Sequence, residues 1–282
     1  FFQHSFEQMM RYDGYRPIVF LYHGLWAAFF AMTALIAAVA LVKHDDGPRR
    51  ALWLGALLWM FFVLVLCKSL GSLAYGILLA PLILLLTTRT QIIVAALIAV
   101  LALSYPAARS ADLVPTDRIL ALAERVNEER ASSLRFRFQN EELLQDRANL
   151  KPLFGWGSWG RNHVYAGDGR SLTISDGRWI IVLGVYGWIG LISELLLLSL
   201  PIFLMLREAW RADPARLPPY AGTLSLLLAI TLVELIPNGT LTPVTWLIGG
   251  ALWGVAERMR RREVEHVEEV TPEPVPRWRP II

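Results

Sequence analysis

Seven stretches of this chain are apolar over nearly the length of a bilayer-crossing helix. A helix needs about 20 mostly apolar residues to cross the hydrocarbon layer of a membrane. The stretches are Ile18–Val42, Ala51–Leu66, Ser72–Thr87, Gln91–Ser104, Trp179–Leu206, Tyr220–Ile236 and Val244–Ala256. The fifth is long enough to begin with a turn lying in the membrane interface. The pattern predicts an all-α, polytopic integral membrane protein with about seven transmembrane helices.

The composition supports this class and argues against others. Of the 282 residues, 55% are hydrophobic and only 18% are charged, which is unlike a soluble protein of this size. The net charge of +3 is small and the basic residues lie in loops, so a nucleic-acid role has no support. Cys67 is the single cysteine, which excludes an intrachain disulfide.

The basic residues predict the orientation. Short loops rich in Lys and Arg stay in the cytoplasm, whereas long loops are exempt from this rule. One side carries Lys43, Arg49, Arg50, Arg89, Arg207, Arg211, Arg216, Arg258, Arg260, Arg261 and Arg262, and the short segments of the other carry Arg11, Arg16 and Lys68. We expect the first side to be cytoplasmic and the segment Tyr105–Arg178 to lie outside. An outside start without a signal peptide further predicts an odd number of upstream spans.

Four regions follow from this reading. Residues 1–104 hold an external N-terminal segment and four spans, 105–178 the external loop domain, and 179–257 three more spans. Residues 258–282 are Pro-rich and charged, so we expect a disordered cytoplasmic tail. Within the loop, helices are predicted over 117–130 and 131–149, the second ending before Pro152. We expect this partly helical domain to cover a cavity that opens sideways to lipid.

Two sequence segments resemble a known family. RFQNEELLQDRANLKPLFGWG, which begins at Arg137, resembles the large periplasmic loop of the O-antigen ligase and O-antigen polymerase superfamily of bacterial envelope glycosyltransferases. SDGRWIIVLGVYGWIGLISELLLL is similar to the segment by which that family re-enters the membrane, with a Gly-x-x-Gly step at Gly187 and Gly190. Many of its ligases carry a His-Asn pair where this chain has Asp176 and Gly177. The difference favours a divergent, polymerase-like member.

The resemblance implies a function in exopolysaccharide or O-antigen biosynthesis. The expected activity is that of an inverting glycosyltransferase in the bacterial inner membrane, with its large loop in the periplasm. It would transfer or polymerise a glycan from an undecaprenyl-diphosphate-linked donor onto a glycan or lipid-linked acceptor. Other envelope-polysaccharide assembly proteins are possible partners. The loop contains no Asp-x-Asp motif, so a metal-independent mechanism without a cofactor is the simpler hypothesis.

Two residues are the candidates for catalysis. The family's arginine falls on Arg137, and a permanently charged guanidinium suits a diphosphate that gains charge as it leaves. The ordinary alternative is a surface arginine paired with Glu141 one turn later. Asp176 is placed to act as the general base for the acceptor hydroxyl. Its ordinary alternative is an N-cap of the helix that starts near Arg178.

Six further residues are candidates for substrate binding: Arg135, Lys68, Arg16, Arg161, His163 and Arg178. For the cations, the alternatives are headgroup contact, snorkelling and anchoring at the interface. His163 lies in a polar turn, where a histidine often has no chemical role. Glu194, deep in an apolar stretch, is expected to pair with one of these cations.

Two other classes of function stay open. A transporter or flippase of a lipid-linked or small solute would place charged residues along a path through the membrane, whereas here the cations gather at the predicted outer surface. A membrane scaffold would use the loop to bind a periplasmic partner. Loss of turnover with binding retained, after a change at Arg137, would favour catalysis over scaffolding.

Overall fold

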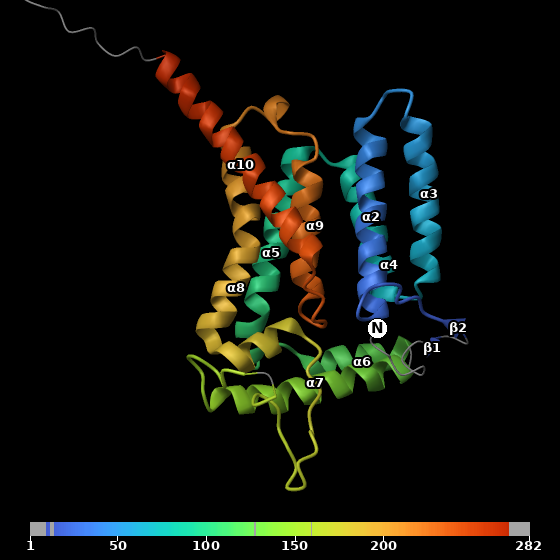
Figure 1. Cartoon of the computed structure of the whole chain (residues 1–282), viewed down its shortest axis with the longest axis vertical. Coiled ribbons are helices and arrows are strands. Elements are labelled where there is room, and N and C mark those ends of the chain that lie inside the picture. Colours follow the sequence, from blue (N-terminus) through green and yellow to red (C-terminus); the bar gives the residue numbers. More distant parts are fainter. Residues whose placement is uncertain (1–9, 12–13, 127, 159, 271–282) are drawn as a thin grey trace, which may run out of the picture.

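The computed structural model describes residues 10–11, 14–126, 128–158 and 160–270, and this part of the chain is mostly helical (Figure 1). A short hairpin of two strands precedes the helices. The elements in chain order are β1 (Met10–Arg11), β2 (Gly14–Tyr15), α2 (Gly24–His44), α3 (Arg50–Leu66), α4 (Leu70–Leu85), α5 (Thr88–Ser110), α6 (Thr116–Val126), α7 (Glu128–Asn149), α8 (Arg178–Arg211), η1 (Pro214–Arg216), α9 (Ala221–Glu234) and α10 (Pro243–Val270). A helix forms within each of the apolar stretches, and the predicted all-α fold class is confirmed.

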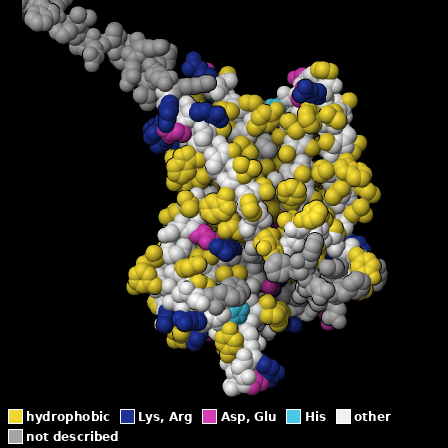
Figure 2. Space-filling view, viewed as in Figure 1, with side chains coloured by type: hydrophobic (Ala, Val, Ile, Leu, Met, Phe, Trp, Pro, Cys, Tyr) yellow, Lys and Arg dark blue, Asp and Glu magenta, His cyan; other side chains and the backbone are white. Residues whose placement is uncertain are grey.

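Three helices, α2, α5 and α8, are long and apolar enough to cross a membrane, whereas α3, α4 and α9 are apolar but shorter. On the face shown in Figure 2, charged side chains gather towards the two ends, and a broad apolar belt lies between them. Large apolar side chains such as Leu58, Phe62 and Leu101 are exposed. So much exposed apolar surface is expected where lipid takes the place of water. The chain therefore has the features of a helical membrane protein.

The bundle consists of two groups of helices. Helices α5, α8, α9 and α10 pack together, and α2, α3 and α4 form the second group. Helices α5 and α9 can approach closely because α5 turns small residues such as Ala95 and Ala99, both fully buried, towards the core. Between the two groups, α2, α3 and α10 surround an apolar cavity of about 600 Å³. The lining includes no residue of the loop domain, so a cavity covered by that domain and open sideways to lipid stays a prediction.

The two helices predicted in the external loop are present as α6 and α7, and they lie across one end of the bundle (Figure 1). Leu144 and Ala148 of α7 are buried against Trp179 and Leu183 near the start of α8. This small second core fixes α7 on the end of the bundle. The candidate site lies beside it.

Helix α8 bends at Gly187, where φ is 68° and ψ is −170°. The part before the bend runs along the end of the bundle, and the longer part runs up the bundle (Figure 1). The turn 152–157 packs into the bend, and the Trp188 amide donates a hydrogen bond of 2.7 Å to the Pro152 carbonyl. Backbone groups released by the bend thereby find partners. That this segment starts in the membrane interface stays a prediction.

Several predicted boundaries differ from the structure, including the start of the first apolar helix, which is Gly24 instead of Ile18, and the limits of the two loop helices. Helix α5 continues to Ser110, so the loop domain does not begin at residue 105. The tail is helical to Val270, whereas disorder was expected from residue 258. Glu257 forms ion pairs with Arg260 and Arg261, one turn later, and the segment is rich in strong helix formers, which together extend the helix. Residues 271–282 of the predicted tail lie outside the described residues.

Candidate active site

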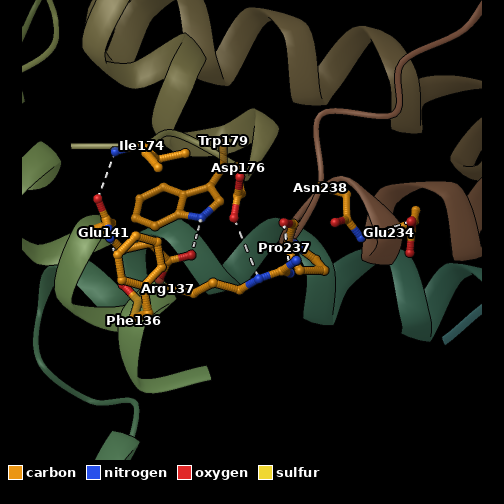
Figure 3. Close-up of polar contacts among 10 residues, drawn as sticks. Phe136, Arg137, Glu141, Ile174, Asp176, Trp179, Glu234, Pro237 and Asn238 are labelled. Atoms are coloured by element: carbon orange, nitrogen blue, oxygen red, sulfur yellow. Dashed lines mark hydrogen bonds and ion pairs between the residues drawn. The ribbon is translucent and has the colours of Figure 1, made fainter. Parts of the chain in front are cut away.

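The two predicted catalytic residues lie side by side although they are far apart in the sequence (Figure 3). Arg137 belongs to α7, and Asp176 lies just before α8. The Arg137 Nε is 3.5 Å from the Asp176 Oδ2, and its Nη1 donates to the Pro237 carbonyl at 3.3 Å. Their side chains are 32% and 42% exposed, so both are accessible. Figure 3 shows the Arg137 side chain extended towards the α9–α10 turn, with Glu234 and Asn238 beyond Pro237.

Arg137 is held more loosely than two other predicted arginines. Strong hydrogen bonds from a guanidinium to a carboxylate are about 2.7–2.9 Å long, and both contacts of Arg137 are longer. Arg178 Nε and Nη2 donate to the two carboxylate oxygens of Glu194 at 2.7 and 2.8 Å, which confirms the expected pairing of Glu194 with a cation. Arg135 is paired with Glu124 of α6. An anionic ligand would therefore have to break weaker contacts to bind Arg137 than to bind Arg178 or Arg135.

Asp176 is not the N-cap of α8, so the alternative prediction that it only caps this helix is wrong. The cap position belongs to Gly177, and no side chain caps the helix there. The backbone is fixed from the other side, because the Arg178 amide donates to the Leu235 carbonyl at 2.9 Å. A Cβ on Gly177 would lie 2.2 Å from the Ile236 carbonyl oxygen, so this position needs a glycine. Backbone packing thus places Asp176 without using its carboxylate.

The structure pairs Arg137 with Asp176 and not with Glu141, which was the partner expected for an ordinary surface arginine. Glu141 is only 9% exposed, and its carboxylate accepts hydrogen bonds from the Tyr105 hydroxyl at 3.2 Å and the Trp179 indole at 3.4 Å. The Arg109 Nε lies 3.8 Å from the same carboxylate. Burial raises the pKa of Glu141, although both hydrogen bonds and the arginine charges act in the opposite direction. The sequence suggested Glu141 only as a surface partner of Arg137, because it lies one turn later, and did not indicate that it is buried.

Asn140, which sequence reasoning also missed, fixes the segment that leads to Asp176. Its Oδ1 accepts a hydrogen bond of 2.7 Å from the Ile174 amide, and its Nδ2 donates to the Phe136 carbonyl at 2.8 Å. Both bonds are shielded, because Asn140 is 6% exposed. The side chain therefore ties α7 to the strand-like stretch before α8.

His163 lies next to the site although it is distant in sequence. Its Nδ1 is 3.1 Å from the Thr173 carbonyl oxygen, and its Nε2 is 3.5 Å from the Ser175 hydroxyl. A carbonyl only accepts hydrogen bonds, so Nδ1 carries the proton in this contact and Nε2 is the basic nitrogen of the neutral ring. The structure thus places an imidazole beside the residue that precedes Asp176.

The remaining predicted residues lie elsewhere. Arg161 is exposed, and its carbonyl accepts a hydrogen bond from Arg147. Lys68 lies in the turn between α3 and α4 with a φ of 50°. Arg16 is 6% exposed and packs so closely that a Cβ on Gly24 would lie 1.9 Å from its Cδ. Lys68 and Arg16 belong to the part of the fold around α2–α4, and their role in binding the substrate stays a prediction.

The cavity between the helix groups reaches the α9–α10 turn. Its lining is almost wholly apolar and includes Trp26, Phe29, Phe30, Met60, Val63 and Ile248. Thr240 also lines it, is 2% exposed, and has an Oγ1 without a hydrogen-bond partner in the described part of the chain. A Cβ on the neighbouring Gly239 would lie 3.5 Å from the Asp176 carbonyl oxygen. Gly239 and Thr240 of this turn thus lie between the backbone of Asp176 and the cavity.

Fold and site together define a helical membrane protein with a cation–carboxylate pair at one end of its bundle, next to an apolar cavity. Within the described ranges, no group of three or more His, Cys, Asp or Glu side chains is arranged to hold a metal ion. No family model, no curated protein and no solved structure matches the chain.

Proposed function

We propose that this protein is an integral-membrane glycosyltransferase acting at the periplasmic face of a bacterial inner membrane. Its donor is a glycan linked to undecaprenyl diphosphate, and its acceptor is a hydroxyl of a glycan or a lipid-linked sugar. The observation that carries the proposal is the loosely held Arg137 beside Asp176, next to an apolar cavity. In this proposal the apolar helices make seven crossings, and α6 and α7 lie outside.

The reaction assigns a task to each residue of the pair. The acceptor oxygen attacks the anomeric carbon, and the bond from that carbon to the diphosphate oxygen breaks. The bonding electrons leave with the diphosphate, where Arg137 stabilises the growing negative charge. The hydroxyl proton passes to the Asp176 carboxylate, or to the Nε2 of His163 as the second candidate. Attack opposite to the leaving group inverts the anomeric configuration.

The cavity supports a lipid-linked donor. Its apolar lining from α2, α3 and α10 suits a hydrocarbon chain, because the chain can enter without burying polar groups. Thr240 offers a hydroxyl where the cavity approaches the pair, at the place expected for the polar end of such a lipid. A donor seated this way would hold its diphosphate near Arg137.

The arrangement of charges supports the proposed orientation. The α2–α3, α4–α5 and α8–α9 connections and the C-terminal part of α10 lie at one end of the bundle, opposite α6 and α7 (Figure 1). These connections carry most of the basic residues outside the long loop, including Lys43, Arg89 and Arg216. Under the positive-inside rule, that end is cytoplasmic.

The alternative is a transporter or flippase of a lipid-linked or small solute, and the cavity is the observation that favours it. A flippase would also bind the lipid, but it would move the donor without releasing undecaprenyl diphosphate. Product analysis therefore separates the two. A scaffold would do neither.

The test uses the whole protein in membranes, with Arg137→Ala compared with Arg118→Ala at matched levels. Arg118 is an exposed arginine of α6 in the same loop domain and is not a candidate for substrate binding, so its variant is a matched control. Elongation or transfer of an undecaprenyl-diphosphate-linked oligosaccharide is followed together with release of undecaprenyl diphosphate. Loss of product in Arg137→Ala alone, with the donor accumulating, supports the proposal. Full activity of that variant overturns it.

A further inference from the structure

One buried carboxylate holds together the three helices around the candidate site. Glu141 of α7 accepts from Tyr105 of α5 and from Trp179 of α8. The rings of Tyr105 and Trp179 also contact each other edge to face, with centroids 5.7 Å apart. Arg109 of α5 approaches the same carboxylate to 3.8 Å. Glu141 thus connects α7 to both helices on which it rests.

The energetic cost of this arrangement argues for a specific role. A carboxylate that is removed from water loses solvation, and burial is the largest influence on the pKa of Glu141. Neither hydrogen bond to it is short, so the bonds compensate this loss only in part. An apolar side chain could fill the same space without that loss. What an apolar side chain could not supply is two directed hydrogen-bond acceptors and a negative charge near Arg137.

The position of Glu141 in α7 specifies what it can control. Residues four apart lie on the same face of a helix, so Glu141 and Arg137 both face the end of the bundle. Trp179, which Glu141 accepts from, comes three residues after Asp176. The neighbouring Asn140 fixes Ile174, two residues before Asp176. Asn140 and Glu141 therefore hold the segments on both sides of Asp176 against the helix that carries Arg137.

We infer that Glu141 is a positioning residue, which keeps Arg137 in register with Asp176 by fixing α7 on Tyr105 and Trp179. Its effect on transfer rests on the proposed function, whereas its effect on the attachment of α7 does not. Glu141→Gln keeps an oxygen acceptor and the size of the side chain. Glu141→Ala removes both contacts. Glu142→Ala is the matched control, because Glu142 is exposed on the same helix.

Two measurements on the whole protein in nanodiscs test the inference. Hydrogen exchange in peptides covering α7 and residues 172–180 should increase in Glu141→Ala and not in Glu142→Ala. With the undecaprenyl-diphosphate-linked donor, kcat/KM should fall roughly ten- to a hundredfold in Glu141→Ala, and Glu141→Gln should recover most of it. In the Arg137→Ala background, Glu141→Ala should cause little further loss, because it acts through Arg137.

The two ideas fail in different ways. If the wild-type protein transfers no glycan, the proposed function fails, and the exchange measurement still decides whether Glu141 fixes α7. Equal exchange in Glu141→Ala and Glu142→Ala overturns the positioning role. An additive loss in the double variant also overturns it, since a merely structural residue would lower activity regardless of Arg137.

Discussion

Replacing Asp176 by Asn should strengthen anion binding at Arg137 while weakening transfer. Asp176 occupies the space beside the guanidinium in the ligand-free structure, with 3.5 Å between Nε and Oδ2. A donor diphosphate has to take over this contact or share it. The substitution removes the negative charge at nearly constant size, so Asp176 no longer competes with an anion for Arg137. It also removes the proposed general base.

The geometry sets the size of the effect. Both side chains are partly exposed and the contact is long, so the pair resembles surface ion pairs, which contribute about 0.2–1 kcal/mol. Removing that competition should tighten binding of inorganic diphosphate by a factor of about 1.4–5. Loss of a general base should slow transfer by roughly 10²–10⁴-fold, less if His163 takes over the proton.

The assay is diphosphate binding to the purified protein at low ionic strength, where screening is weak, together with transfer from the lipid-linked donor. Asp146→Asn is the control, because Asp146 is an exposed carboxylate on α7. The gain in binding should vanish in the Arg137→Ala background. Unchanged or weaker diphosphate binding in Asp176→Asn would refute the view that this carboxylate occupies the anion site.

Three further changes probe the surroundings of the pair. Gly187→Ala should sharply reduce the amount of folded protein, because φ is 68° and the new Cβ would lie 2.3 Å from the Leu153 carbonyl oxygen; membrane levels and thermal unfolding measure this. Thr240→Val removes a buried hydroxyl that has no hydrogen-bond partner in the described part of the chain, so the free energy of unfolding without donor should stay the same or increase by up to about 1 kcal/mol. The same substitution should weaken donor binding. Glu141 has a folded pKa above its ordinary value of 4.5, so its contribution to stability is full below that value and is lost as the pH rises through the folded pKa. The thermal midpoint of the wild-type protein, measured relative to that of Glu141→Gln, should therefore decrease as the pH rises above 4.5.

The helices were predictable because their signal is local. An apolar run of the right length in a chain with few charges has helix as its main low-energy option in a membrane, whatever the rest of the chain does. The ends were less predictable. Helix α5 continues beyond its apolar run to Ser110, where Arg109 is buried beside Glu141. Such continuation depends on contacts between elements, which the local sequence does not display.

The pairing of Arg137 with Asp176 was predictable only as two separate candidates. Their identity came from the resemblance and from the chemistry of a diphosphate leaving group. Their contact requires that α7 crosses the end of the bundle next to the start of α8. This arrangement depends on the packing of Leu144 and Ala148 against α8. The burial of Glu141 could not be predicted for the same reason, because a glutamate on a charged helix has the same sequence pattern whether it is buried or exposed.

The contrast between two arginines explains why the site centres on one of them. Arg178 and Arg137 both lie near Asp176, but Arg178 would have to give up two bonds of 2.7 and 2.8 Å to Glu194 before it could bind an anion. Arg137 is positioned through its helix, by residues that contact neighbouring elements without clamping the guanidinium. A leaving diphosphate needs a guanidinium whose position is fixed but whose N–H donors can exchange their present partners for phosphate oxygens. Preorganisation lowers the barrier only if the ligand can reach the positive charge. Positioning through the backbone and weak pairing of the guanidinium are therefore two parts of one requirement, and of these two arginines Arg137 meets both.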